Sequence, residues 1–130
     1  PLIVRTAASP LDRDAMTLDW NGIAKLWEQG VPVAFSGTYT NGLSAREDML
    51  WNGIEMMKIL HDSSAVLPML TSVPAKIMGV DHLTGSLQEG LRADIVIWSG
   101  NPLESYQAHI VRTYQGGRII YREGDEMKCM

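Results

Sequence analysis

The chain has 130 residues, of which 45% are hydrophobic, and it carries a formal net charge of −4. This length and composition are typical of a soluble globular domain. The scattered charges exclude a basic nucleic-acid surface and a polybasic membrane segment. The apolar runs are far shorter than the ~18 residues of a bilayer-spanning helix, and the single cysteine, Cys129, excludes an internal disulfide. We therefore expect a cytoplasmic protein that binds neither nucleic acid nor membrane.

The first third of the chain predicts a strand, a helix and a second strand. The apolar run 2–4 has the composition of a buried strand. A helix follows, with Thr17 as its N-cap and Gly30 as its stop. The run 31–35 then predicts another buried strand. The buried face of the helix comprises Trp20, Ile23, Ala24 and Trp27. This order is that of a parallel α/β unit.

Three helices are predicted next. Ser44 and Glu47 form a capping box for the first, and its apolar face comprises Leu50, Ile54, Met57 and His61. Residues 62–64 cap the second, in which Pro68 predicts a kink costing ~3 kcal/mol. In the third, Pro74 suits the first helical position and Gly79 the end.

The last third is rich in strand signals. Gly85 and Gly90 predict turns on either side of a short strand, and the run 95–98 predicts a longer buried strand. Residues 110–114 and 118–121 predict a β-hairpin closed by a glycine pair.

Two motifs lie between the helices and the hairpin: T-S-V-P-A-K-I-M-G-V at 71–80 and G-S-L-Q-E-G-L-R-A-D-I-V-I-W at 85–98. With G-N-P-L at 100–103 and G-G-R-I-I-Y at 116–121, they resemble the C-terminal signature of the metal-dependent amidohydrolase superfamily, especially its imidazolonepropionase-like and dihydroorotase-like members. The resemblance implies an α/β fold in two parts. Residues 1–78 would be the last strands and helices of a (β/α)8 barrel, and residues 79–130 strands of the small composite β-sandwich with the C-terminal tail.

The resemblance also implies a reaction, the hydrolysis of amide or cyclic amide C–N bonds by a complete enzyme that holds a divalent metal such as zinc. The family's metal-binding histidines would lie upstream of this chain. Its strand-eight aspartate falls at Thr38, whose hydroxyl has no useful basicity near neutral pH. We therefore expect no catalytic residue here, and only Thr38, Tyr39 and Thr40 as candidates for a substrate loop.

Other residues do not replace the missing ligands. His61, His82 and His109 lie far apart in the sequence and have none of the spacings typical of metal sites. No serine has a G-x-S-x-G context. We therefore expect neither a metal nor another cofactor in this chain.

Three interpretations remain open. The chain is the C-terminal part of an amidohydrolase-like enzyme, a hydrolase-like protein that has lost metal catalysis, or a binding or assembly module. Two barrel strands alone would leave apolar surfaces and an open sheet edge. We therefore expect self-association or a retained upstream fragment, with a small-molecule substrate only in the completed enzyme.

Overall fold

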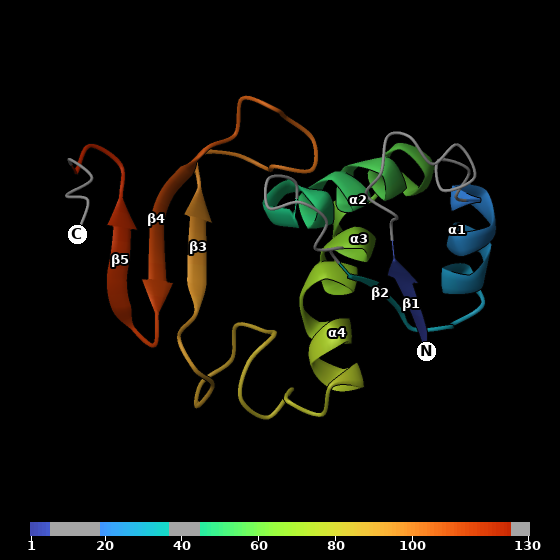
Figure 1. Cartoon of the computed structure of the whole chain (residues 1–130), viewed down its shortest axis with the longest axis horizontal. Coiled ribbons are helices and arrows are strands. Elements are labelled where there is room, and N and C mark those ends of the chain that lie inside the picture. Colours follow the sequence, from blue (N-terminus) through green and yellow to red (C-terminus); the bar gives the residue numbers. More distant parts are fainter. Residues whose placement is uncertain (6–18, 37–44, 126–130) are drawn as a thin grey trace.

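The computed structural model describes residues 1–5, 19–36 and 45–125. In Figure 1 a helical part that includes two parallel strands lies on one side and a separate three-stranded sheet lies on the other. The elements in chain order are β1 (Leu2–Arg5), α1 (Trp20–Glu28), β2 (Val33–Ser36), α2 (Ala45–Leu60), α3 (Ser63–Leu70), α4 (Ser72–Ile77), β3 (Ile95–Trp98), β4 (Ile110–Gln115) and β5 (Arg118–Arg122). The mixed α/β class predicted from the sequence is confirmed.

Strand β2 is the centre of the helical part. It pairs with β1 in parallel, from Leu2 opposite Val33 to Arg5 opposite Ser36. The helices α1, α2, α3 and α4 all contact β2, and its residues 33–35 are buried. The predicted parallel unit of strand, helix and strand is therefore confirmed, and its second strand begins at Val33, after Pro32.

Helix α1 has defined ends. The side chain of Asp19 accepts a hydrogen bond from the Gly22 N–H at 2.9 Å, so Asp19 is the N-cap. The prediction of Thr17 as the cap is therefore wrong, and Thr17 itself lies outside the described residues. Gly30, with φ 83°, stops the helix as predicted, because glycine adopts this conformation without a Cβ clash. The rings of Trp20 and Phe35, 5.9 Å apart, join α1 to β2.

The buried face of α2 differs from the predicted one. Asn52, Gly53 and Met56 are buried, whereas the predicted Leu50, Ile54 and Met57 are half-buried at the edge of the core. A Cβ on Gly53 would lie 2.9 Å from both Leu103 Cδ2 and Leu70 Cδ1. Gly53 therefore lies at a point of the helix where a side chain would clash with Leu70 and Leu103. His61 is exposed just beyond the helix, and the predicted cap Ser44 lies outside the described residues.

Helices α3 and α4 follow directly. Asp62 caps α3 as predicted, since its Oδ1 accepts from the Ser64 N–H at 2.9 Å. Pro68 lies inside α3, which continues to Leu70. Pro74 is the third residue of α4 rather than the first. The first four N–H groups of a helix have no partner within the helix, so the missing N–H of Pro74 costs no helical hydrogen bond.

Gly79, with φ 69°, ends α4 as predicted. Its N–H donates to Lys76 O at 3.1 Å and the Val80 N–H donates to Ala75 O at 2.9 Å, the paired bonds of a Schellman motif.

The predicted hairpin is confirmed. β4 and β5 pair antiparallel on either side of Gly116 and Gly117, whose φ values of 55° and 80° fit a two-residue hairpin turn. β3 pairs with the other edge of β4. The predicted short strand between Gly85 and Gly90 is absent, because residues 80–94 form turns and loop.

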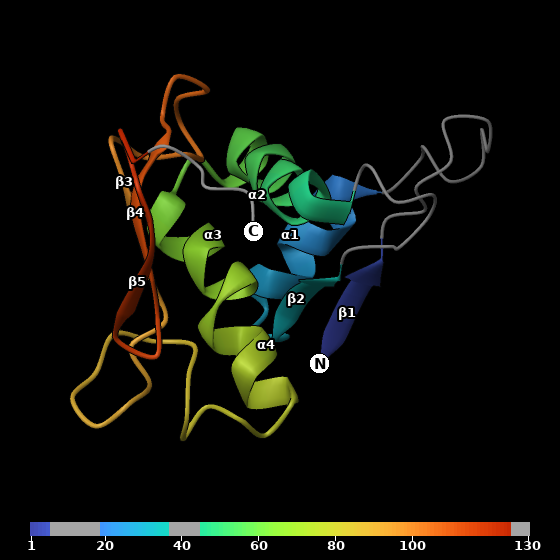
Figure 2. The ribbon, with the colours of Figure 1, turned by 60° about the vertical axis from the view of Figure 1, so that its left-hand side comes forward.

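The prediction that β3 is buried is also wrong, since Val96 is 46% and Ile97 42% exposed. The backbones of the described helices make no close approach to this sheet, which Figure 2 shows near its edge. The link to the helical part comes from the loop after β3, where Leu103 is 7% exposed and joins the core.

The core comprises Val4, Ile23, Ala24, Val33, Phe35, Met56, Val66, Met69 and Leu103. Within the described part of the chain, no helix is both long enough and apolar enough to cross a membrane.

Candidate functional site

The carboxyl edge of the β1–β2 pair is the first candidate site. Arg5 and Ser36 are the last residues of their strands and lie opposite each other in the parallel register. The segments that follow both strands therefore start from the same edge. The predicted substrate-loop residues Thr38, Tyr39 and Thr40 come directly after β2, and they lie outside the described residues.

Asn52 is a polar residue whose importance sequence reasoning missed. It is 2% exposed on α2, a helix that contacts β2, and it has an interaction partner. A buried amide normally has its hydrogen bonds satisfied, and satisfying them fixes its orientation. The sequence gives no signal for this burial, because an asparagine between Trp51 and Gly53 looks like a surface residue.

The three histidines lie in different parts of the molecule. His61 follows α2, His82 lies in the loop after α4, and His109 precedes β4. Across residues 1–5, 19–36 and 45–125, no group of three or more His, Cys, Asp or Glu side chains could hold a metal ion. The described residues therefore do not fit the metal that the family resemblance implies for a complete enzyme.

A serine, a histidine and a glutamate do meet at one end of the β3–β5 sheet, although the sequence did not indicate it. The His109 Nδ1 lies 3.1 Å from the Ser99 Oγ and 3.2 Å from the Gln107 carbonyl oxygen. Its Nε2 lies 3.1 Å from the Glu123 Oε1. The antiparallel register, with Trp98 opposite Ile110, brings Ser99 beside His109.

This cluster suits a structural connection rather than nucleophilic catalysis. The Gln107 carbonyl can only accept, so a donor role for the His109 Nδ1 in that contact leaves no lone pair there for the Ser99 hydroxyl. A histidine that activates a serine must instead offer a lone pair to the hydroxyl. The His109 and Glu123 side chains are 57% and 53% exposed, so the cluster also lacks the water-excluded surroundings of a catalytic site.

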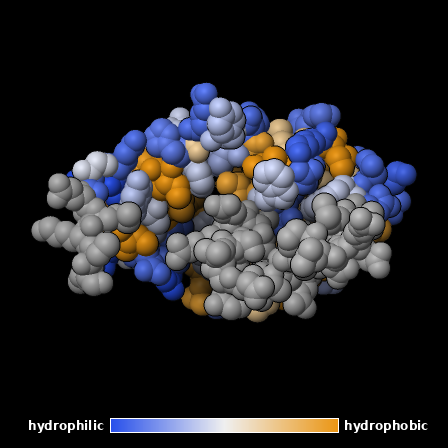
Figure 3. All heavy atoms as spheres, turned by 45° about the horizontal axis from the view of Figure 1, so that its top comes forward, coloured by the Kyte–Doolittle hydropathy of each residue, from blue (hydrophilic) through white to orange (hydrophobic). Residues whose placement is uncertain are grey.

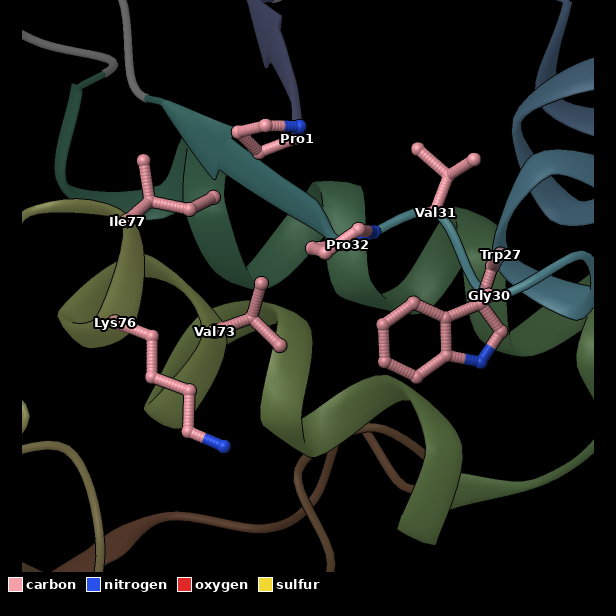
Figure 4. A pocket seen from close by; sticks show the side chains of 8 residues that line it. All are labelled: Pro1, Trp27, Gly30, Val31, Pro32, Val73, Lys76 and Ile77. Carbon is pink, nitrogen blue, oxygen red and sulfur yellow. The ribbon is translucent and has the colours of Figure 1, made fainter.

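A cavity of about 600 Å³ lies at the opposite end of the β1–β2 pair. Pro1 and Pro32 line it just before their strands begin, and α1 and α4 provide Trp27, Val73 and Ile77. Figure 4 shows these side chains around one space, with the Nζ atom of Lys76 pointing away from the two prolines. The lining contains no carboxylate and no histidine, and Lys76 is the ionisable side chain that it includes.

Comparison with known proteins identifies the family. The family model described as "Amidohydrolase family" matches residues 14–121, and the chain therefore belongs to this family. A 5-methylthioadenosine/S-adenosylhomocysteine deaminase of Desulforudis audaxviator is 32% identical over 114 residues, which cover 74% of this chain and 25% of that protein.

Solved structures agree with this result. An amidohydrolase from Thermotoga maritima superposes with a TM-score of 0.72 at 28% identity, over 88% of this chain and 29% of that one. A 5-methylcytosine deaminase from Klebsiella pneumoniae superposes with a TM-score of 0.66 at 20% identity, over 98% of this chain and 35% of its own length. The chain thus spans about a quarter to a third of these relatives.

Proposed function

We propose that this chain is the C-terminal part of an enzyme that hydrolyses a C–N bond by deamination. The relative at 32% identity is a deaminase of 5-methylthioadenosine and S-adenosylhomocysteine. In such a reaction water adds to the ring carbon that bears the amino group, and ammonia then leaves. The proposed substrate class is therefore an aminopurine nucleoside or a similar heterocyclic amine.

The observation that carries the proposal is the parallel register of β1 and β2. Because of this register, the segments after Arg5 and Ser36 begin at the same end of the two strands. This is the carboxyl end, where the active sites of (β/α)8 barrels lie. We infer that residues 1–78 are the last part of such a barrel and that residues 79–130 belong to the small β-sandwich with the tail. The buried β2 and the separate antiparallel β3–β5 sheet support this division.

In this proposal the chain contributes substrate contacts and the missing part contributes the metal site. A divalent metal such as zinc would polarise water in the complete enzyme, and its ligands would come from outside the described residues. Thr38, Tyr39 and Thr40 would line the substrate side of the strand end. Hydroxyl groups at these positions can donate to and accept from a heterocyclic base.

Thr38 also supports the second candidate, a hydrolase-like protein without catalysis. It occupies the position of the family's aspartate, and its hydroxyl cannot take a proton from an attacking water near neutral pH. Under this alternative the chain acts in binding or assembly.

We further propose that the chain self-associates or holds an upstream fragment. Among the described residues, both strands of the β1–β2 sheet have an unpaired edge, and Trp51 and Leu67 are 60% and 53% exposed. Light scattering at micromolar concentration tests this proposal, and a compact monomer without a co-purifying fragment would contradict it.

Ammonia release separates the two functions. The longest natural protein that contains this chain is incubated with 5-methylthioadenosine or S-adenosylhomocysteine, and its metal content is measured in parallel. Ammonia release with stoichiometric metal supports the deaminase, whereas a folded, metal-free and inactive protein supports the alternative. Thr38→Val should lower the rate if Thr38 contacts substrate. Thr113→Val, the same change in β4, should leave the rate unchanged.

A further inference from the structure

The β3–β5 sheet has one face on which two arginines lie among apolar side chains. The register places Ile97, Arg112 and Arg122 in one row across the three strands and Ile95, Tyr114 and Ile119 in the next row on the same face. We call these six residues the arginine face. A hydrogen bond of 3.1 Å from the Arg112 Nη1 to the Tyr114 hydroxyl confirms that the two rows face the same side.

The two arginines are poorly satisfied within the described chain. They lie directly opposite each other on β4 and β5, and like charges in this position destabilise a sheet. The Nε of Arg112 is buried and has no hydrogen-bond partner among the described residues. Arg122 forms no ion pair with any acid in the part of the chain that the structure describes.

Two carboxylates that lie close to these strands in the sequence are engaged elsewhere. Glu123 pairs with His109, and Asp94 pairs with Arg92. The arginine face therefore keeps its positive charge although the whole chain carries a net charge of −4. An unsatisfied cationic pair of this kind is complementary to a carboxylate, which accepts charge-assisted hydrogen bonds.

The apolar neighbours indicate that the carboxylate is carried by a polypeptide. Ile97 is 42% and Ile119 43% exposed, and Figure 3 shows hydrophobic side chains open to solvent on the side of the molecule where Figure 1 places the sheet. A free small anion would leave these side chains in water. A polypeptide segment with acidic and apolar side chains would pair with the arginines and also cover these apolar side chains.

We propose that the arginine face docks an extended acidic and apolar polypeptide segment, with a carboxylate between Arg112 and Arg122. A second copy of the chain fits poorly, because a two-fold contact through this face would place guanidinium groups against guanidinium groups. The proposal does not depend on the proposed deaminase activity.

A defined peptide tests this docking. The probe is a dye-labelled, acetylated pentapeptide of alternating valine and glutamate, titrated with the full 130-residue chain, and its matched control replaces each glutamate with glutamine. We expect the glutamate peptide to bind about tenfold more tightly, as the loss of one charge-assisted contact predicts. Its affinity should fall as the salt concentration rises.

Arginine variants locate the contact. Arg122→Gln should weaken binding of the glutamate peptide about tenfold, because it removes one of the two guanidinium groups. Arg118→Gln removes the same charge from the same strand, but Arg118 lies opposite Gln115, so its effect should stay below about twofold. Circular dichroism confirms that both variants are folded.

Several results would overturn the proposal. Equal binding of the glutamate and glutamine peptides would remove the role of the carboxylate, and equal effects of the two variants would indicate general electrostatic attraction. Displacement of the peptide by inorganic phosphate at the same concentration would indicate a site for small anions. A dimer that the glutamate peptide dissociates would identify a second copy as the occupant.

Discussion

The Asp94 carboxylate holds the tip of a hairpin that lies 22 residues further along the chain. Its Oδ1 accepts a hydrogen bond from the Gly116 N–H at 2.8 Å, and the Gly117 N–H donates to the neighbouring Ala93 carbonyl at 2.9 Å. The Arg92 Nε lies 2.9 Å from the Asp94 Oδ2. The alanine and aspartate of the A-D-I-V-I-W motif thus have a structural role, since they fix the β4–β5 turn beside the start of β3.

Asp94→Ala should therefore destabilise the chain by about 1–2 kcal/mol, because the Gly116 N–H loses a charged acceptor. Asp94→Asn keeps an acceptor oxygen and loses only the exposed pair with Arg92, so its cost should stay below about 1 kcal/mol. Urea unfolding of both variants measures the difference. Equal losses would show that the charge, rather than the turn contact, carries the effect.

Leu103 provides a test of the link between the sheet and the helices. Leu103→Ala should cost about 2–5 kcal/mol, because a 7% exposed side chain is removed from the core. Leu87→Ala is the matched control, with a side chain 79% exposed, and should change stability by less than about 0.5 kcal/mol. Similar unfolding midpoints for the two variants would refute the docking of the loop.

Two glycines with positive φ allow the cost of backbone strain to be measured separately from the cost of steric crowding. Gly85 has φ 100°, and an added Cβ would lie 2.5 Å from the Ala75 Cβ and 3.1 Å from the Thr71 carbonyl oxygen. Gly90 has φ 87° and open space around it. Gly90→Ala should cost about 1–2 kcal/mol from strain alone, and Gly85→Ala about 1–3 kcal/mol more. Thermal unfolding measures both, and equal costs would contradict the close approach to α4.

Asp62 predicts a pH effect in acid. A hydrogen bond from the Ser64 hydroxyl, followed by one from the Ser64 N–H, holds the pKa of Asp62 below its ordinary value of 3.8. Because the folded pKa is depressed, the cap contributes stability above pH 3.8 and loses it as the pH falls through the lower folded pKa. In a carboxyl NMR titration, Ser64→Ala should raise the Asp62 pKa toward 3.8, and Ser63→Ala should leave it unchanged.

Metal content is a further test. We expect the purified chain to bind well under one equivalent of zinc, iron or manganese, because the described residues contain no cluster of ligands. Thr38→Asp alone should not produce hydrolysis. Elemental analysis that finds stoichiometric metal would overturn this expectation.

The features that the sequence predicted correctly depend on neighbouring residues. Gly30 and Gly79 end their helices, and the glycine pair closes the hairpin, because each needs only the local backbone conformation that glycine permits. The parallel unit was also predictable, since a buried strand, a helix and a second buried strand leave few alternatives.

The features that the sequence did not predict depend on distant partners. The inward face of α2 is set by Leu70 and Leu103, which crowd Gly53 from other parts of the chain. The cluster of Ser99, His109 and Glu123 is set by strand register. For the candidate site, the loop residues Thr38, Tyr39 and Thr40 stay predictions, whereas the common edge at Arg5 and Ser36 required the pairing of β1 with β2.

The two kinds of strand pairing also have different consequences for the speed of folding. β4 and β5 are joined by a two-residue turn, so their pairing closes a very short loop. Leu2 must meet Val33 across the intervening helix α1, and a parallel pair of this kind gains no contacts until that segment is ordered. We therefore expect amide protons of the hairpin to become protected from exchange before those of β1 and β2 during refolding.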